Sequence, residues 1–163
     1  MYCVPEGNPI LPNLAVRIIL VRMTEEMDWN DFNRNLIDEF RANGGTTSGP
    51  FADAPLVLIT TTGAKSGKER TTPLVHTTDG DKVVIIASKA GAPAHPHWYL
   101  NILANPEVTV ELPGETFRAR ATAITEGPER DRLYRAQADL MPNFDEYEQL
   151  TDRKIPVVVL ERI

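Results

Sequence analysis

The chain lacks several features that would each define a class of protein. Cys3 is the only cysteine among 163 residues, so no disulfide can form within the chain, and we expect a reducing, cytoplasmic setting. The longest apolar stretch near the N-terminus, Leu14–Met23, is interrupted by Arg17 and Arg22. It is about half as long as the ~20 residues that a membrane span requires. A peripheral membrane contact through this segment remains an alternative.

An excess of positive charge is also missing. The chain has 17 lysines and arginines against 23 aspartates and glutamates, a net charge of −6, which repels nucleic acid and anionic membranes. Hydrophobic residues make up 42% and charged residues 25%, the proportions of a globular protein. We expect residues 1–22 to be an N-terminal extension of a single domain over residues 23–163.

Residues for nucleophilic or metal chemistry are scarce. The chain has only three serines, and none lies in the Gly-x-Ser-x-Gly pattern of a hydrolase nucleophile. His95 and His97 are close in sequence to each other, but no cysteine or third histidine stands near them. Zinc normally takes three or four ligands at recognisable spacing, so no metal site is expected.

The hydrophobic pattern predicts an α+β protein. Helices are expected over residues 24–43, 97–105, 128–141 and 143–151, and strands over 56–62, 70–78, 82–88, 107–112, 116–125 and 155–161. Pro73 predicts that the second strand lies at an edge or carries a bulge. Because hairpin-length links join most strands, the pattern favours an antiparallel barrel with flanking helices over a doubly wound sheet.

A basic, glycine-containing loop, Thr62–Arg70, joins the first two strands. It places three cations within six residues, and backbone amides beside such cations suit phosphate or carboxylate binding. It is not a Walker A loop, since three residues rather than four precede its Gly-Lys pair. Residues 63–89 have a net charge of +2, which leaves −8 for the rest of the chain. The alternatives are a solvated hairpin loop and an anion-binding interaction module.

Two further segments are candidates for a binding site. Small residues follow the third strand over Ala87–Trp98, which would leave room for a flat ligand beside Ser88 and Lys89; a flexible connection is the alternative. Near the C-terminus, Met141, Phe144 and Tyr147 recur every three residues. They predict a soft apolar helix face for a substrate, or the ordinary packing of a helix.

Several blocks, in order, resemble the deazaflavin-dependent nitroreductase family, actinobacterial enzymes that use coenzyme F420. They are Leu-Ile-Thr-Thr-Thr-Gly-Ala-Lys-Ser-Gly-Lys-Glu-Arg (58–70), Pro73-Leu74, Ala-Ser-Lys-Ala-Gly-Ala (87–92), His-Pro-His-Trp-Tyr-Leu-Asn (95–101), Ala-Asn-Pro (104–106) and Thr-Asp-Arg-Lys-Ile-Pro-Val-Val (151–158). No single block is specific, but their combination is.

The resemblance implies a split β-barrel that binds F420 and passes a hydride to an electron-poor acceptor. It places Lys65 and Arg70 on the phosphate and acidic tail of the cofactor. The full implied cofactor set is Lys65, Ser66, Gly67, Arg70, Thr71, Pro73, Ala87, Ser88, Lys89, Ala90, Gly91, Trp98 and Asn101. Ser88 and Tyr147 are the expected catalytic residues, with Ser88 donating to the acceptor oxygen that gains charge. The implied acceptor set is Val75, His76, Met141, Phe144 and Tyr147.

The chain departs from family members that act on nitroimidazoles. These carry tyrosines where Met141 and Phe144 stand, and a larger aromatic residue where Val75 stands. The resemblance therefore implies a less polar, roomier pocket, suited to enones, unsaturated lactones or quinones. An FMN-dependent oxidoreductase on the same barrel and a non-catalytic carrier of F420 or an apolar ligand are the alternatives. Exposed strand edges would allow a homodimer.

Overall fold

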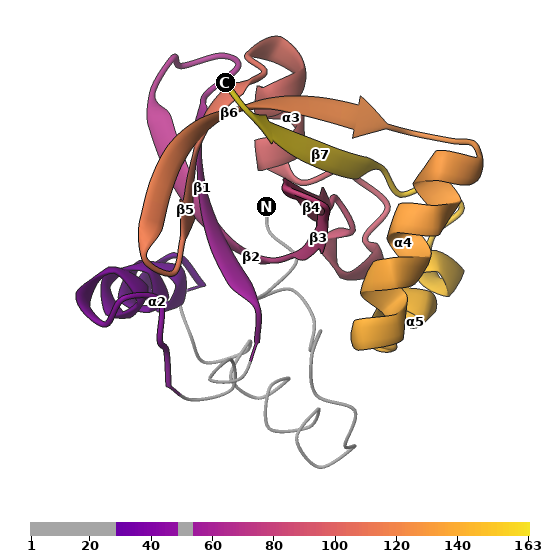
Figure 1. Cartoon of the computed structure of the whole chain (residues 1–163). Coiled ribbons are helices and arrows are strands. Elements are labelled where there is room, and N and C mark those ends of the chain that lie inside the picture. Colours follow the sequence, from indigo (N-terminus) through magenta and orange to yellow (C-terminus); the bar gives the residue numbers. More distant parts are fainter. Residues whose placement is uncertain (1–28, 49–53) are drawn as a thin grey trace.

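The computed structural model describes residues 29–48 and 54–163, which form a curled sheet with helices around it (Figure 1). The described strands are β1 Leu56–Thr62, β2 Glu69–Val75, β3 Thr77–Asp79, β4 Lys82–Ile86, β5 Glu107–Leu112, β6 Glu115–Ile124 and β7 Val157–Arg162. Their spatial order is β2-β1-β5-β6-β7-β4-β3, and all neighbours are antiparallel. The first and last strands of this order are joined by a single residue, His76, so the sheet curls into a half-barrel. The predicted α+β split barrel is confirmed.

The outer position of β2 explains its proline. Pro73 lies opposite Leu58 of β1, and in the described sheet β1 is the only neighbour of β2. A residue without an N–H is tolerated there because the free side of the strand needs no donor. The expectation of an edge strand is confirmed.

The prediction of one strand over residues 70–78 is wrong. The chain breaks at His76, whose backbone N–H donates to the carbonyl of Pro55 (3.0 Å), so β2 ends and β3 begins on either side of it. β2 pairs with β1, whereas β3 pairs with β4. A change of pairing partner leaves no mark in the alternation of side chains, so the local pattern could not reveal it.

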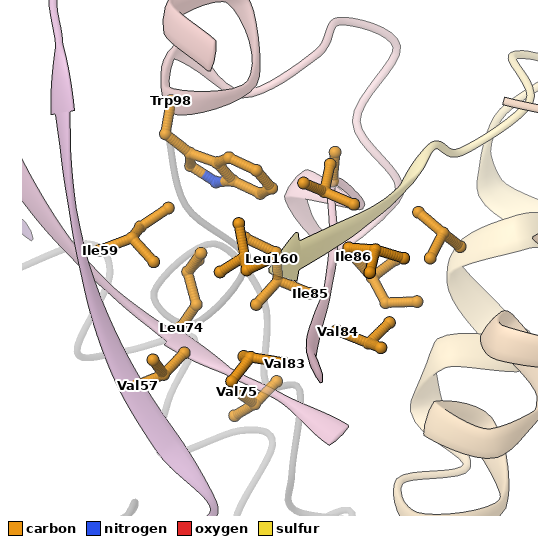
Figure 2. Close-up of a cluster of buried hydrophobic side chains, with 14 of the residues drawn as sticks. Val57, Ile59, Leu74, Val75, Val83, Val84, Ile85, Ile86, Trp98 and Leu160 are labelled. Carbon is orange, nitrogen blue, oxygen red and sulfur yellow. The ribbon is translucent and has the colours of Figure 1, made fainter. Parts of the chain in front are cut away.

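The core lies inside the curl. Val57 and Ile59 of β1 face Leu74 and the consecutive residues of β4, and Trp98 covers one end of the cluster (Figure 2). All four residues from Val83 to Ile86 are buried, as the apolar run predicted. Each such side chain contributes about 1.5–3 kcal/mol by leaving water.

Within residues 29–48 and 54–163, four helices and one short 3₁₀ turn surround the sheet. The helices are α2 Trp29–Ala42, α3 His97–Ala104, α4 Pro128–Leu140 and α5 Asn143–Leu150, and the turn is η2 Lys89–Gly91. α3 packs on β1, and α5 packs on α4 and η2. The last three helices match their predicted ranges to within a residue. The start predicted for the first helix and the expected extension over residues 1–22 lie outside the described residues. None of the helices in residues 29–48 and 54–163 has the length and apolarity needed to cross a membrane.

Candidate functional site

The basic loop between β1 and β2 is held by its own hydrogen bonds. The Gly63 N–H donates to the Lys68 carbonyl (2.8 Å), the Gly67 N–H to the Gly63 carbonyl (3.0 Å), and the Lys68 N–H to Ser66 Oγ (3.2 Å). Gly67 has a φ of +70°, a conformation that glycine adopts without strain. The loop backbone is therefore defined, while the side chains of its three cations are exposed.

Asn101 of α3 joins this loop to the helix. Its buried side chain accepts a hydrogen bond from the Ala64 N–H (3.0 Å) and donates to Thr61 Oγ1 (3.3 Å). The next strand is tied in a similar way, since the Thr71 hydroxyl lies 2.8 Å from that of Thr60. Asn101 and Thr71, both of which are predicted cofactor residues, thus shape the candidate site. Their contact with a cofactor stays a prediction.

Most of the described cations without a carboxylate partner belong to this site. Most described lysines and arginines form an ion pair with aspartate or glutamate, but six do not: Lys65, Lys68, Arg70, Lys89, Arg118 and Arg153. Lys65 and Arg70 belong to the basic loop and Lys89 to the η2 turn, yet the charges of all three act on His97. We call Lys65, Lys68, Arg70 and Lys89 the cation cluster. Its charge is left available for an anion.

The segment after β4 forms a tight, strained turn. Ser88 is fully buried, and its Oγ has no hydrogen-bond partner among the described residues. Lys89 has a φ of +47°, a region that residues other than glycine seldom occupy. At Gly91, a Cβ would lie 2.9 Å from the carbonyl oxygen of Tyr147. The structure therefore brings the predicted ring-binding segment against the helix that carries a predicted catalytic residue.

Arg153 holds this segment, and the sequence reasoning did not single it out. Its guanidinium donates to the carbonyls of Ser88 (2.7 Å), Ala92 (2.9 Å) and Ala87 (3.2 Å) and to Nδ1 of His95 (3.1 Å). Its partial burial lowers the pKa of the guanidinium. The one signal in the sequence was its place in the block of residues 151–158.

The C-terminal apolar face packs into the molecule. Met141, Phe144 and Tyr147 are all buried, and the rings of Phe144 and Tyr147 meet edge to face at 5.1 Å between centroids. Asn143 donates to the Tyr147 hydroxyl (2.8 Å). These contacts match the packing alternative, and the contact of this face with an acceptor stays a prediction.

The other two predicted acceptor residues lie far from the cation cluster. Val75 is buried in the core and ends β2, about 17 Å along the strand from Arg70 at the usual rise per residue (Figure 2). His76 follows it, with Nδ1 2.8 Å from the Pro55 carbonyl, and burial lowers its pKa. Among residues 29–48 and 54–163, no three histidines, cysteines or acidic residues lie close enough together to hold a metal ion.

Trp98 and Ala87, which are also members of the predicted cofactor set, lie in the interior of the protein. Both are buried, and the Trp98 indole Nε1 has no hydrogen-bond partner in the part of the chain that is described. The Ala87 N–H donates to the Pro156 carbonyl (3.0 Å) at the entry to β7. Pro73 lies in β2 beyond Arg70. The predicted cofactor residues therefore come from the basic loop, β2, the η2 turn and α3.

Comparison with known proteins identifies the family of the chain. The model of the F420H(2)-dependent quinone reductase family matches residues 32–162. An F420H(2)-dependent quinone reductase of Mycobacterium tuberculosis is 40% identical over 110 residues, which cover 66% of this chain and 74% of that protein. Among solved structures, an F420-H2 dependent reductase, FDR-A, is 42% identical with a TM-score of 0.61, covering 66% of this chain and 94% of the other. A domain-swapped dimer is 38% identical with a TM-score of 0.63, covering 82% and 100%.

The match spans the basic loop, the η2 turn and the segment of Arg153. It confirms the resemblance to F420-dependent enzymes and supports F420 over the alternative of FMN. It also supports an enzyme over a non-catalytic carrier. The chain belongs to the F420H(2)-dependent quinone reductase family and is an F420-dependent oxidoreductase.

Proposed function

We propose that this enzyme reduces quinone-type acceptors at the η2 turn, with F420 held by the cation cluster. The observation that carries the proposal is the gathering of unpaired cations on an acidic protein. Lys65, Lys68, Arg70 and Lys89 have no carboxylate partner in the described chain, whereas the cations elsewhere are mostly paired. A phosphate and an acidic tail are the anions that such a cluster suits.

The buried polar atoms near the turn also fit a bound ring. Ser88 Oγ and Trp98 Nε1 are buried without a partner, a costly state that a ligand would relieve. The strained backbone of Lys89 is of a kind that clusters at ligand sites. Reduced F420 supplies a hydride, and the protein supplies orientation and electrostatics.

The roles of the protein groups follow from this arrangement. In this proposal Ser88 Oγ donates a hydrogen bond to an acceptor oxygen as it gains charge, and in a dry site such a donor contributes about 3 kcal/mol. Lys65 and Arg70 bind the anionic part of the cofactor, and Lys89 extends the same positive region. Tyr147 and the buried apolar residues Met141 and Phe144 exclude water on the side of α5.

Quinones are the first acceptors to test, because the family and the relative from Mycobacterium tuberculosis are named for them. Enones, unsaturated lactones and nitro compounds are further candidates from the resemblance. We also propose a homodimer, which the domain-swapped dimer among the similar structures supports, in a cytoplasmic setting. The alternative of a membrane contact rests on residues outside the described part.

The test is an F420 fluorescence titration followed by oxidation of the reduced cofactor with menadione. Lys65→Ala with Arg70→Ala should weaken F420 binding at least about tenfold, since each removes a charge-assisted contact. The affinity of the unaltered enzyme should fall as salt increases and rise with the length of the acidic tail.

The matched control is Lys82→Ala with Arg120→Ala, which removes two cations that pair with Glu161 and Glu107 away from the site. The control should bind F420 almost as the unaltered enzyme does. Equal affinity of the two double variants would show that the cofactor is not held by the cation cluster.

A further inference from the structure

Arg153 makes an unusual set of contacts for a partly buried arginine. In the described structure it has no carboxylate partner, and its donors are used on three main-chain carbonyls and one imidazole. Arg130 provides a contrast, because it binds the Ile155 carbonyl but also pairs with Asp131 and Glu148. The contacts of the Arg153 guanidinium therefore all lie within one stretch of the chain, Ala87–His95.

That segment needs an external support. Within it, the Gly91 N–H donates to the Ser88 carbonyl (2.9 Å) and the Ala92 N–H to the Lys89 carbonyl (3.0 Å), which forms only a single 3₁₀ turn. Lys89 stands in the left-handed region, a strained conformation that persists only where surrounding contacts enforce it. Arg153 binds the carbonyls on both sides of this residue, at Ser88 and at Ala92.

His95 orients the guanidinium. An arginine can only donate, so Nδ1 of His95 accepts, and the imidazole is neutral with its proton on Nε2. The His95 ring in turn packs on Tyr99 of α3, with centroids 4.9 Å apart. The contact therefore links Arg153 to the helix whose Asn101 holds the basic loop.

We propose that Arg153 is a positioning residue that holds Ser88 and Lys89 in the geometry needed for F420-dependent reduction. The inference rests on the proposed function, since it assigns Arg153 an effect through Ser88. Lysine cannot replace it, because a single ammonium cannot reach three carbonyls with the planar fork of a guanidinium. A shift of about 1 Å in such a site lowers turnover about a hundredfold.

A double-mutant cycle tests the proposal, with Arg153→Lys, Ser88→Ala and both together assayed for menadione reduction by reduced F420. Arg153→Lys should lower kcat about ten- to hundredfold at a temperature where circular dichroism shows it folded. Ser88→Ala should then cost less than about threefold in the Arg153→Lys background, because the hydroxyl is already displaced. If Arg153→Lys does not fold, Arg153→Gln takes its place in the same cycle.

The matched control is Arg130→Lys, which also removes contacts to a main-chain carbonyl. It should lower Tm and leave kcat unchanged, as expected of a purely structural arginine. The proposal is overturned if Arg153→Lys behaves like Arg130→Lys, or if Ser88→Ala costs the same factor in both backgrounds. An unaltered enzyme that neither binds F420 nor reduces menadione would instead refute the proposed function.

Discussion

The surroundings of the Ser88 hydroxyl are the most informative feature of the candidate site. Ser88 is fully buried at the end of β4, and its Oγ lacks a partner in the described structure. An unpaired buried hydroxyl costs free energy, so a residue that packs equally well without it, such as alanine, would be favoured by stability alone. The proposed contact of Ser88 with cofactor or substrate would supply the missing partner.

Ser88→Ala should therefore lower turnover far more than affinity. We expect kcat with menadione to fall about a hundredfold and the Kd for F420 to stay within about twofold, because the hydroxyl acts on charge that develops during reaction. Steady-state kinetics and a fluorescence titration measure the two quantities. An unchanged kcat would remove Ser88 from the reaction.

At the scale of elements, η2 packs closely against α5. Gly91 has a φ of +80°, and a Cβ there would lie 2.9 Å from both the Tyr147 carbonyl oxygen and the Leu150 Cβ. Gly114 has nearly the same φ, +79°, but nothing lies within 4 Å of its Cβ position. Alanine substitutions at the two glycines therefore distinguish the cost of backbone strain from the cost of close packing.

Gly91→Ala should destabilise the protein more than Gly114→Ala. Both carry the left-handed cost of about 1–2 kcal/mol, and Gly91→Ala adds about 1–3 kcal/mol of overpacking against α5. Urea unfolding of both variants gives the difference in the free energy of unfolding. Equal values would mean that α5 moves away from η2 without cost.

The corner between β2 and β3 closes the half-barrel and carries a titratable group. The His76 ring is partly buried, and its Nδ1 lies 2.8 Å from the Pro55 carbonyl, which accepts a hydrogen bond from it. Burial lowers the pKa from its ordinary value of 6.5, against the opposing effect of this hydrogen bond. The folded state therefore takes up a proton at this ring less readily than the unfolded state does.

The free energy of unfolding should decrease as the pH falls below about 6.5. Above that value the ring is neutral in both states, and the stabilisation is complete; below it the unfolded state gains protons first. His76→Asn keeps a donor for Pro55 but cannot titrate, so its loss of stability over this range should be smaller. Urea titrations at several pH values measure the free energy of unfolding of both proteins. Parallel pH dependences would exclude His76 as the source of the lost stability. His95 also has a lowered pKa, owing to burial and the charge of Arg153, so part of the slope should remain.

At the scale of the whole molecule, charge is divided rather than evenly spread. The net charge is −6, yet four of the six described cations without a carboxylate partner form the cation cluster, while Arg132, Arg135 and Arg162 are engaged by carboxylates. An acidic surface with a local positive region suits a small anionic cofactor and repels larger polyanions. The segments described above as the candidate site all lie between Gly63 and Lys154 in the sequence.

A variant that lacks residues 1–22 should bind F420 with an unchanged Kd. These residues precede every segment that forms the candidate site, and they lie outside the described part of the chain. Fluorescence titration and a thermal melt of the shortened protein test this directly. A large loss of affinity would show that the N-terminal segment belongs to the functional domain.

Features that depend on neighbours in sequence were predictable from the chain. The strands over residues 56–62 and 107–112 have their predicted bounds, because apolar and β-branched runs between turn residues specify them locally. The basic loop and the Ser88 segment were recognisable for the same reason, since each carries its chemistry within a dozen consecutive residues.

Long-range partners were decided by the fold alone. The net charge of +2 over residues 63–89 includes Lys82. Strand pairing places this lysine beside Glu161, so it does not contribute to the cation cluster. The break at His76 arises because β2 and β3 pair with different strands. Arg153 reaches carbonyls 61 to 66 residues earlier in the chain, and only the packing of its segment against the end of β4 brings them together. Hydrogen bonds to main-chain carbonyls do not depend on the identity of the accepting residue, so no local pattern marks them in advance.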